Sequence, residues 1–404
     1  MRDTDLFQLA LGLQSPWFVK DCRFDAQARR LDIDLDFARG GRFPCPDCGK
    51  PDCPTHDTFD KKWRHLDFFQ HQAFLHARTP RITCSDCGVK LVNVPWARPG
   101  SGFTLLFEAL AMTLMGAMPV AAAARIVKEY DTLLWRVLHH WVGKARERAD
   151  YATVKRVAID ETAAKRGHNY ISLFVDIDQR CVVFGTEGRG ADTVERFADD
   201  LKMHNGDAAN VEEVCIDMSA AFIKGVGEHL PEAEITFDKF HAVKLVNDAV
   251  DKVRRAESKG RPELKRSRYL WLRNEPSLSA ESRTTLQQLT RLHLRTARAY
   301  QIRLAFQEIY QQPTRGWGKL FLERWYGWAI RSRLEPMKDA ARTVKKHADG
   351  ILRWFDSQIA NGLIEGINSL VQAAKAKARG YRTTRNLIAI TYLIAGKLDL
   401  RLPT

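Results

Sequence analysis

Two short apolar runs, VKRVAID at residues 154–160 and VEEVCID at residues 211–217, decide the interpretation of this chain. Both are typical of buried strands, and they end in Asp160 and Asp217. A third acid, Glu365, lies in the helix-like stretch NGLIEGINSLVQAAKAKARGYR, which fills with Lys and Arg after the acid. A buried carboxylate is costly unless it is paired or binds a metal. Together the three acids predict a divalent-metal site that meets a polyanion, as phosphoryl transfer on nucleic acid requires.

The order of elements around these acids predicts an α/β layer built on a mixed sheet. Three strands close in sequence form a meander, and later strands separated by helices fit right-handed crossovers onto the same sheet. The expected strands are 154–160, 169–177, 181–187, 211–217 and 233–238, and the expected helices are 191–203, 219–230 and 240–255.

Carboxylates at two strand ends and on one helix suit Mg²⁺, which prefers oxygen ligands. Two such ions can activate the attacking oxygen and stabilise the leaving oxygen at phosphorus. We expect Asp160 to bridge both ions, Asp217 to bind one ion and Glu365 the other. Two alternatives stay open. Each acid is a helix cap or a surface group, or Glu161 or Asp176 takes the place of Asp160.

The composition is that of a basic globular protein. The 404 residues are 45% hydrophobic and carry a formal net charge of +14, which favours binding to phosphate backbones. The N-terminus has no pattern of a secretory signal, and Glu108 and Pro119 interrupt the apolar stretch 103–124, which predicts buried helices instead of a membrane span. We therefore expect a cytoplasmic, nucleoid-associated protein with no membrane partner.

Two C-x-x-C-G motifs predict a structural zinc site. Four thiolates suit tetrahedral Zn²⁺, and the Gly after each second Cys lets the backbone bend so that its amides face the sulfurs. The expected ligands are Cys45, Cys48, Cys84 and Cys87. A β-hairpin fits between the two pairs, and Cys53 and His56 remain alternative ligands.

Three further stretches have patterns of their own. Residues 16–37 predict a β-hairpin, because apolar and polar side chains alternate over residues 30–37. A helix from about Val120, a turn near residues 130–131 and a helix from about Thr132 fit either a helix-turn-helix or an ordinary helical hairpin. Residues 256–350 carry helical signals throughout and predict an all-α insertion.

The order strand–strand–strand–helix–strand–helix resembles the RNase H-like fold, and the positions of Asp160 and Asp217 in it resemble those in DDE transposases. Three strings carry a closer resemblance: IEGIN at 364–368, ARGYR at 378–382 and FDKFHAVKLVN at 237–247. They resemble the ISL-three family of bacterial insertion-sequence transposases, and the resemblance covers nearly the whole chain.

This resemblance implies a catalytic triad of Asp160, Asp217 and Glu365 that works with two Mg²⁺ (or Mn²⁺) ions. It implies hydrolysis at the terminal inverted repeats of an insertion sequence, which frees 3′-OH groups that attack target DNA. The implied partners are double-stranded DNA, at the element ends and at the target, and further copies of the chain on paired ends. A non-catalytic DNA-binding regulator and an RNase H-like structure-specific nuclease are the alternatives.

The helix that carries Glu365 has a polar face. Asn368, Gln372, Lys375 and Arg379 follow the acid at steps of three and four residues, which places them near one side of a helix. We expect these four residues to bind DNA, and the alternative is a solvated charged face. The family often has Lys where Gln372 stands in this chain.

Asp238 and His241 form a D-x-x-H pair just after the fifth expected strand. Related transposases have a comparable pair near the active site, so we place these two residues as accessory groups without a chemical role. A capping Asp and a packed His are an equal alternative.

The chain is thus expected to hold five segments: a β-hairpin and zinc module (1–100), a helix-turn-helix domain (101–150), the first part of an RNase H-like catalytic core (151–255), an α-helical insertion (256–350) and the C-terminal part of the core with the third acid (351–404).

Overall fold

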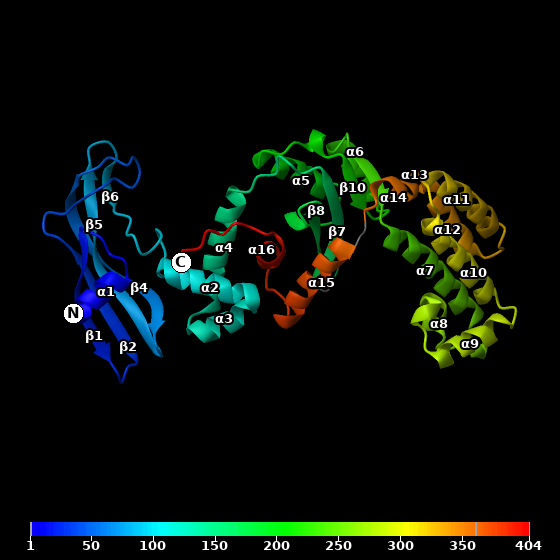
Figure 1. The fold of residues 1–404 in the computed structure, drawn as a ribbon, viewed down its shortest axis with the longest axis horizontal. Helices are drawn as coiled ribbons and strands as arrows, with labels where there is room; N and C mark the ends of the chain where they lie inside the picture. The colour runs from blue at the N-terminus through cyan, green and yellow to red at the C-terminus, as the bar shows by residue number, and fades with distance from the viewer. Residues whose placement is uncertain (1, 166, 168, 360–361, 404) are drawn as a thin grey trace. The chain divides into compact units, whose positions relative to one another are not determined.

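The computed structural model describes residues 2–165, 167, 169–359 and 362–403. They fall into two compact units, Met1–Ala145 with Asp399–Thr404, and Arg146–Leu398. Figure 1 labels the helices and strands of both units.

The first unit begins with a β-sheet of strand order β1-β2-β5-β4-β3, with β6 paired to β5. Leu31, Ile33 and Leu35 are buried on one face, which explains the alternation in the sequence. The expected hairpin is confirmed, and a second long hairpin of β4 and β5 separates the two cysteine pairs. The elements are α1 (Asp3–Ala10), β1 (Trp17–Asp25), β2 (Arg30–Phe37), β3 (Arg42–Phe43), β4 (Cys53–Phe68), β5 (His71–Cys84) and β6 (Gly88–Leu91).

Three helices follow: α2 (Leu105–Ala117), α3 (Val120–Val127) and α4 (Asp131–Glu147). The turn between α3 and α4 contains no Gly, and Lys128 takes the left-handed conformation there, with φ of 57°. Glu108 in α2 is fully buried, and both of its carboxylate oxygens have polar partners. It forms an ion pair with Arg98 at 2.9 Å, and it accepts hydrogen bonds from Ser101 at 2.6 Å and Trp141 at 2.8 Å.

The second unit contains a five-stranded mixed sheet of order β11-β10-β7-β8-β9. The first three strands form the expected antiparallel meander, and β10 runs parallel to both β7 and β11. The strands are β7 (Arg156–Lys165), β8 (Asn169–Asp176), β9 (Cys181–Glu187), β10 (Glu213–Ile216) and β11 (Glu234–Phe237), with helices α5 (Asp192–Met203) and α6 (Ala220–His229) between β9 and β11.

One expectation about the sheet is wrong. Asp160 lies inside β7 and does not close it, because β7 continues to Lys165. The reason is the meander: β8 pairs with β7 as far as Lys165 opposite Asn169, so the backbone of β7 stays extended beyond the acid.

The rest of this unit is helical among the described residues. Trp271 and Trp325 are buried in its core, where Trp325 donates to the carbonyl of Ile302 at 2.8 Å. No described helix is both long enough and apolar enough to cross a membrane. The helices are α7 (Lys239–Glu257), α8 (Arg268–Leu272), α9 (Ala280–Thr290), α10 (Arg295–Glu308), α11 (Arg315–Ile330), α12 (Glu335–Lys346), α13 (Ala348–Leu352), α14 (Trp354–Ser357), α15 (Gly362–Lys377) and α16 (Thr384–Ala395).

We expect Glu108→Gln to destabilise the first unit by about 3 kcal/mol, because it leaves the half-buried Arg98 guanidinium without its counter-charge and removes a fully buried acceptor. Calorimetric thermal unfolding measures the effect. Glu212→Gln is the matched control, since Glu212 forms an exposed ion pair with Lys155, and such pairs contribute at most about 1 kcal/mol. Equal melting temperatures for both variants would contradict a stabilising role of the Glu108–Arg98 ion pair.

Candidate catalytic site and zinc module

Three aspartates stand in one row across neighbouring parallel strands. Cys215 of β10 pairs with Ala158 of β7, and Asp217 and Asp160 each follow these paired residues by two positions. Their carboxylates are close enough to interact electrostatically. Ile216 pairs with Phe237 of β11, so Asp238 follows at the same level. Neighbouring strands lie about 4.8 Å apart, so parallel pairing alone brings three distant segments together.

The row concentrates negative charge around Asp160. The pKa of Asp160 is raised to about 6. Burial is the main cause and the carboxylates of Asp217 and Asp238 add to it, while the backbone N–H of Glu161 and the imidazole of His241 act in the opposite direction. The Glu161 N–H donates to Asp160 Oδ1 at 2.8 Å. Asp160 therefore sits in a site that disfavours its charge and would gain from a cation.

Helix α15 lies beside β7 (Figure 1). Three of its polar side chains contact the strand. Asn368 donates to Asp160 Oδ2 at 2.6 Å, and Gln372 donates to Thr162 Oγ1 at 2.6 Å. A helix advances about 6 Å over four residues and a strand about 6.6 Å over two, so the two elements stay in step. Lys375 continues the pattern and donates to the carbonyl of Ala163.

The four residues expected to bind DNA thus differ in their surroundings. Three of them contact β7, and Arg379 lies exposed beyond the end of α15 with φ of 58°. The structure gives Asn368, Gln372 and Lys375 a role in holding α15 on the sheet. Their contact with DNA stays a prediction.

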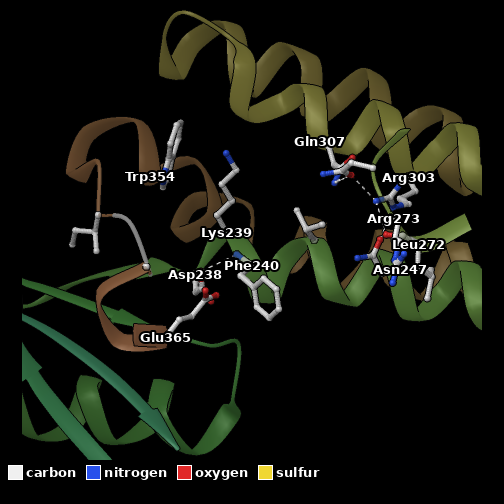
Figure 2. Close-up of a pocket in the computed structure, with 14 residues that line it drawn as sticks. Asp238, Lys239, Phe240, Asn247, Leu272, Arg273, Arg303, Gln307, Trp354 and Glu365 are labelled. Carbon is white, nitrogen blue, oxygen red and sulfur yellow. Dashed lines mark hydrogen bonds between the residues drawn. The ribbon is translucent and has the colours of Figure 1, made fainter. Parts of the chain in front are cut away.

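Glu365 lies one turn before Asn368 on α15 and is exposed. Glu365 and Asp238 line the same pocket, of about 570 Å³, and Figure 2 shows the Glu365 side chain directed toward Asp238. Among the described residues, only the four cysteines bring three or more candidate ligand atoms within 4.8 Å of one another. Asp160, Asp217 and Glu365 do not meet that spacing here, and their role as metal ligands stays a prediction.

Asp238 also caps a helix, as its alternative interpretation held, whereas Asp217 closes the turn before α6, whose N-cap residue is Ser219. Asp217 Oδ1 accepts from the Ser219 N–H at 2.9 Å. Asp238, which is 4% exposed, caps α7 by accepting from the N–H groups of Phe240 and His241. Asp238 Oδ2 also lies 2.8 Å from His241 Nδ1, and this contact raises the pKa of His241. These contacts use only part of each carboxylate, so they do not exclude a second role.

Asp176 and Glu161, the alternatives to Asp160 as a metal ligand, each have polar contacts of their own. Asp176 ends β8, and its Oδ1 accepts from the N–H groups of Asp178 and Gln179 at 2.8 and 3.0 Å, which closes the turn to β9. Glu161 lies 3.8 Å from Arg189 in an ion pair. Asp160 has no such cationic partner among the residues that the structure describes.

The cysteines form the metal site that the sequence predicts. Cys45, Cys48, Cys84 and Cys87 place their sulfurs within 4.8 Å of one another, and Gly49 and Gly88 take φ of 74° and 75° at the two turns. Backbone N–H groups of Asp86 and Cys87 lower the pKa of Cys84 to about 7, which favours the thiolate that binds zinc. Cys53 and His56 are outside this group of ligands.

Three family models match consecutive parts of the chain. A model described as the zinc-finger of the IS204, IS1001, IS1096 and IS1165 transposases matches residues 41–87. The helix-turn-helix domain of transposase family ISL3 matches residues 92–142, and the ISL3 transposase domain matches residues 157–391. The chain belongs to the ISL3 family of transposases. Its β module is a structural zinc site, and α3 and α4 belong to a DNA-binding helix-turn-helix.

Two curated relatives of this transposase align over most of their length. The transposase for insertion sequence element IS1557 of Mycobacterium tuberculosis is 27% identical over 97% of this chain and 96% of its own. The transposase for insertion sequence element IS1001 of Bordetella parapertussis is 29% identical over 84% of this chain and 85% of its own.

Sequence reasoning named Asp238 only as an accessory group and missed its place in the row of aspartates. The signal was present, because the expected strand 233–238 ends in an aspartate just as the run 211–217 does. The register that brings the three acids together is a property of strand pairing, which a single sequence does not display.

We expect Cys84→Ser to reduce zinc affinity on the order of a hundredfold or more and to weaken binding to element-end DNA, because the zinc holds the module together. Zinc content after dialysis against a chelator measures the loss. Cys53→Ser is the control and should retain zinc, since Cys53 is buried beside the site without belonging to it. Equal zinc loss in the two variants would contradict the four-cysteine assignment.

Proposed function

We propose that this transposase cuts phosphodiester bonds at the ends of its insertion sequence and joins the freed 3′-OH groups to target DNA, using Asp160, Asp217 and Glu365 with two divalent ions. The observation that carries the proposal is the row of aspartates on β7, β10 and β11 beside the helix that bears Glu365. The family supplies the reaction class. The row supports the choice of Asp160 and Asp217, and the pocket that Glu365 shares with Asp238 supports the choice of Glu365.

The donor set fits Mg²⁺. The three carboxylates are oxygen ligands, and none of them forms an ion pair with a residue in the described ranges. Asn368 Oδ1 is a buried oxygen beside Asp160 that has no hydrogen-bond partner there either. When bound, the ions would activate the attacking oxygen and stabilise the leaving oxygen at phosphorus.

The chain itself would orient these groups. Asn368 holds one oxygen of Asp160 and the Glu161 N–H holds the other, so the carboxylate plane is fixed against β7. The Ser219 N–H does the same for one oxygen of Asp217. Because these carboxylates are already held in place, they would lose little conformational freedom when they bind an ion. This supports a preorganised site.

A basic hollow beside the same strand supports contact with the DNA backbone. Lys165, Lys375, Arg379 and Arg382 line a pocket of about 720 Å³ at the end of β7 and α15. Clustered Lys and Arg side chains bind phosphates through charge and without reading sequence. We assign recognition of the terminal inverted repeats to the zinc module and the helix-turn-helix, on paired ends held by more than one copy of the chain.

We expect Asp160→Asn, Asp217→Asn and Glu365→Gln each to reduce cleavage of an end fragment by about a thousandfold or more, while binding to that fragment survives. Gel assays with Mg²⁺ and labelled DNA measure both properties. Glu161→Gln and Asp176→Asn are the controls and should cleave normally. Binding without cleavage by the wild type would indicate a regulator, and cleavage without preference for the ends would indicate a nuclease.

We also expect Mn²⁺ affinity to tighten as the pH rises through about 6, because burial raises the pKa of Asp160 to that value and only the ionised carboxylate is a ligand. Titration calorimetry over a series of pH values measures the affinity. Asp160→Asn should bind more weakly and lose this pH dependence. An unchanged pH profile in the variant would separate Asp160 from the metal site.

A further inference from the structure

Within the first unit, one arginine joins the zinc module to the helix-turn-helix segment. Arg64 belongs to the long strand β4, yet it is only 3% exposed. Its guanidinium carbon lies 5.4 Å from the ring centroid of Phe74 in β5 and 5.2 Å from that of Phe107 in α2. The cation is thus held between a ring of the β-sheet and a ring of the helical segment, and both contacts are attractive.

The carboxylates around Arg64 also come from both parts. Arg64 forms an ion pair with Asp67 of β4, and its Nε lies 3.5 Å from Glu129 Oε1. Glu129 stands in the turn between α3 and α4, so it belongs to the helix-turn-helix itself. The side chains of Arg64 and Glu129 are 3% and 17% exposed, so salt and water screen this pair little.

The backbone makes the same connection. The N–H of Arg64 donates to the carbonyl of Gly102 at 2.8 Å, and the N–H of Thr104 donates to the carbonyl of Arg64 at 2.9 Å. Thr104 is the N-cap residue of α2, and its hydroxyl lies 2.9 Å from His65 Nδ1. Residues 102–104 are therefore fixed to β4 by a parallel bridge, and α2 begins from that fixed point.

These contacts make the zinc module and the helix-turn-helix one rigid body. A flexible tether lets two binding parts engage DNA tracts at variable separation, whereas a rigid joint allows one separation only. The distance between two DNA contacts then becomes part of what the protein recognises.

We propose that the zinc module and the helix-turn-helix read two tracts of one element end at a fixed spacing, and that Arg64 and Glu129 are the positioning residues that set this spacing. The inference rests on the proposed function, which assigns recognition of the ends to both parts. Specificity for double-stranded DNA then depends on the separation of the two tracts as well as on their bases.

The test uses the full-length transposase and duplexes that carry the element end, without divalent ions, so that binding is measured in the absence of cleavage. Hydroxyl-radical footprinting of the wild type should show two protected tracts. Two base pairs inserted between these tracts separate them by about 7 Å more and rotate one of them by about 70°. We expect wild-type binding to the inserted duplex to weaken by roughly tenfold to a hundredfold, because both tracts cannot be engaged at once.

Glu129→Gln removes the charge that faces Arg64 and keeps the shape of the side chain. We expect this variant to bind the natural and the inserted duplex within about threefold of each other, because the joint is loosened. Asp60→Asn is the matched control and should keep the wild-type preference. Asp60 is an exposed carboxylate on the same strand β4, and its loss changes the net charge equally.

Arg64→Met is a second variant, which removes the guanidinium and keeps an apolar stem between the two rings. It should relax the spacing preference as Glu129→Gln does, and the double variant should be no more relaxed than either single variant, since all three lose the same pair. A merely structural role would weaken binding to both duplexes alike and leave the ratio of the two affinities unchanged. That result would overturn the positioning role of the pair.

The outcomes distinguish this inference from the proposed function. Equal wild-type binding to the natural and inserted duplexes, or protection of one tract only, overturns the fixed spacing without any variant and leaves the proposed function standing. Absence of wild-type cleavage in Mg²⁺, with the spacing preference intact, overturns the proposed catalysis and supports this inference.

Discussion

Parallel pairing of β7, β10 and β11 is the constraint on which the candidate site depends. Parallel strands in register repeat side chains at one level across a sheet, so acids at equivalent positions become neighbours without any local sequence relation. Asp160, Asp217 and Asp238 are brought together in this way. Helix α15 is then held on β7 by Asn368 and Gln372, which contact Asp160 and Thr162 at matched steps along the two elements.

Glu108, a buried charge in the first unit, has partners that offset its charge. The buried charges of Asp160 and Arg303 have no partner of opposite charge among the described residues. Glu108 is buried completely, yet Arg98, Ser101 and Trp141 satisfy it. Asp160 is held by neutral donors, and its acidic neighbours raise its pKa. Arg303 is the opposite case, a buried cation surrounded by amides. Uncompensated buried charges are costly, so each of these two groups points to a ligand of opposite charge.

Much of the fold could be predicted because its signals are local. The period-two pattern of residues 30–37, the paired Cys-x-x-Cys-Gly motifs and the helical pattern of residues 256–350 each depend on neighbours in the chain, and the structure agrees with all three. The exact end of β7 was missed because it depends on β8, which keeps pairing beyond Asp160. The left-handed turn at Lys128 was missed because Gly usually fills that position.

The sequence by itself determined the pairing of the cysteine motifs, the helical segments and the strands of the mixed sheet, and it predicted the acids, since each follows from residue type and spacing along the chain. Only the tertiary structure decided that Asp238 joins the row of acids, that Asn368 and Gln372 hold α15 against β7, and that Arg303 lies buried without a carboxylate partner among the described residues. The reason is physical: strand register, helix docking and burial depend on contacts between segments far apart in sequence, and no local pattern encodes them.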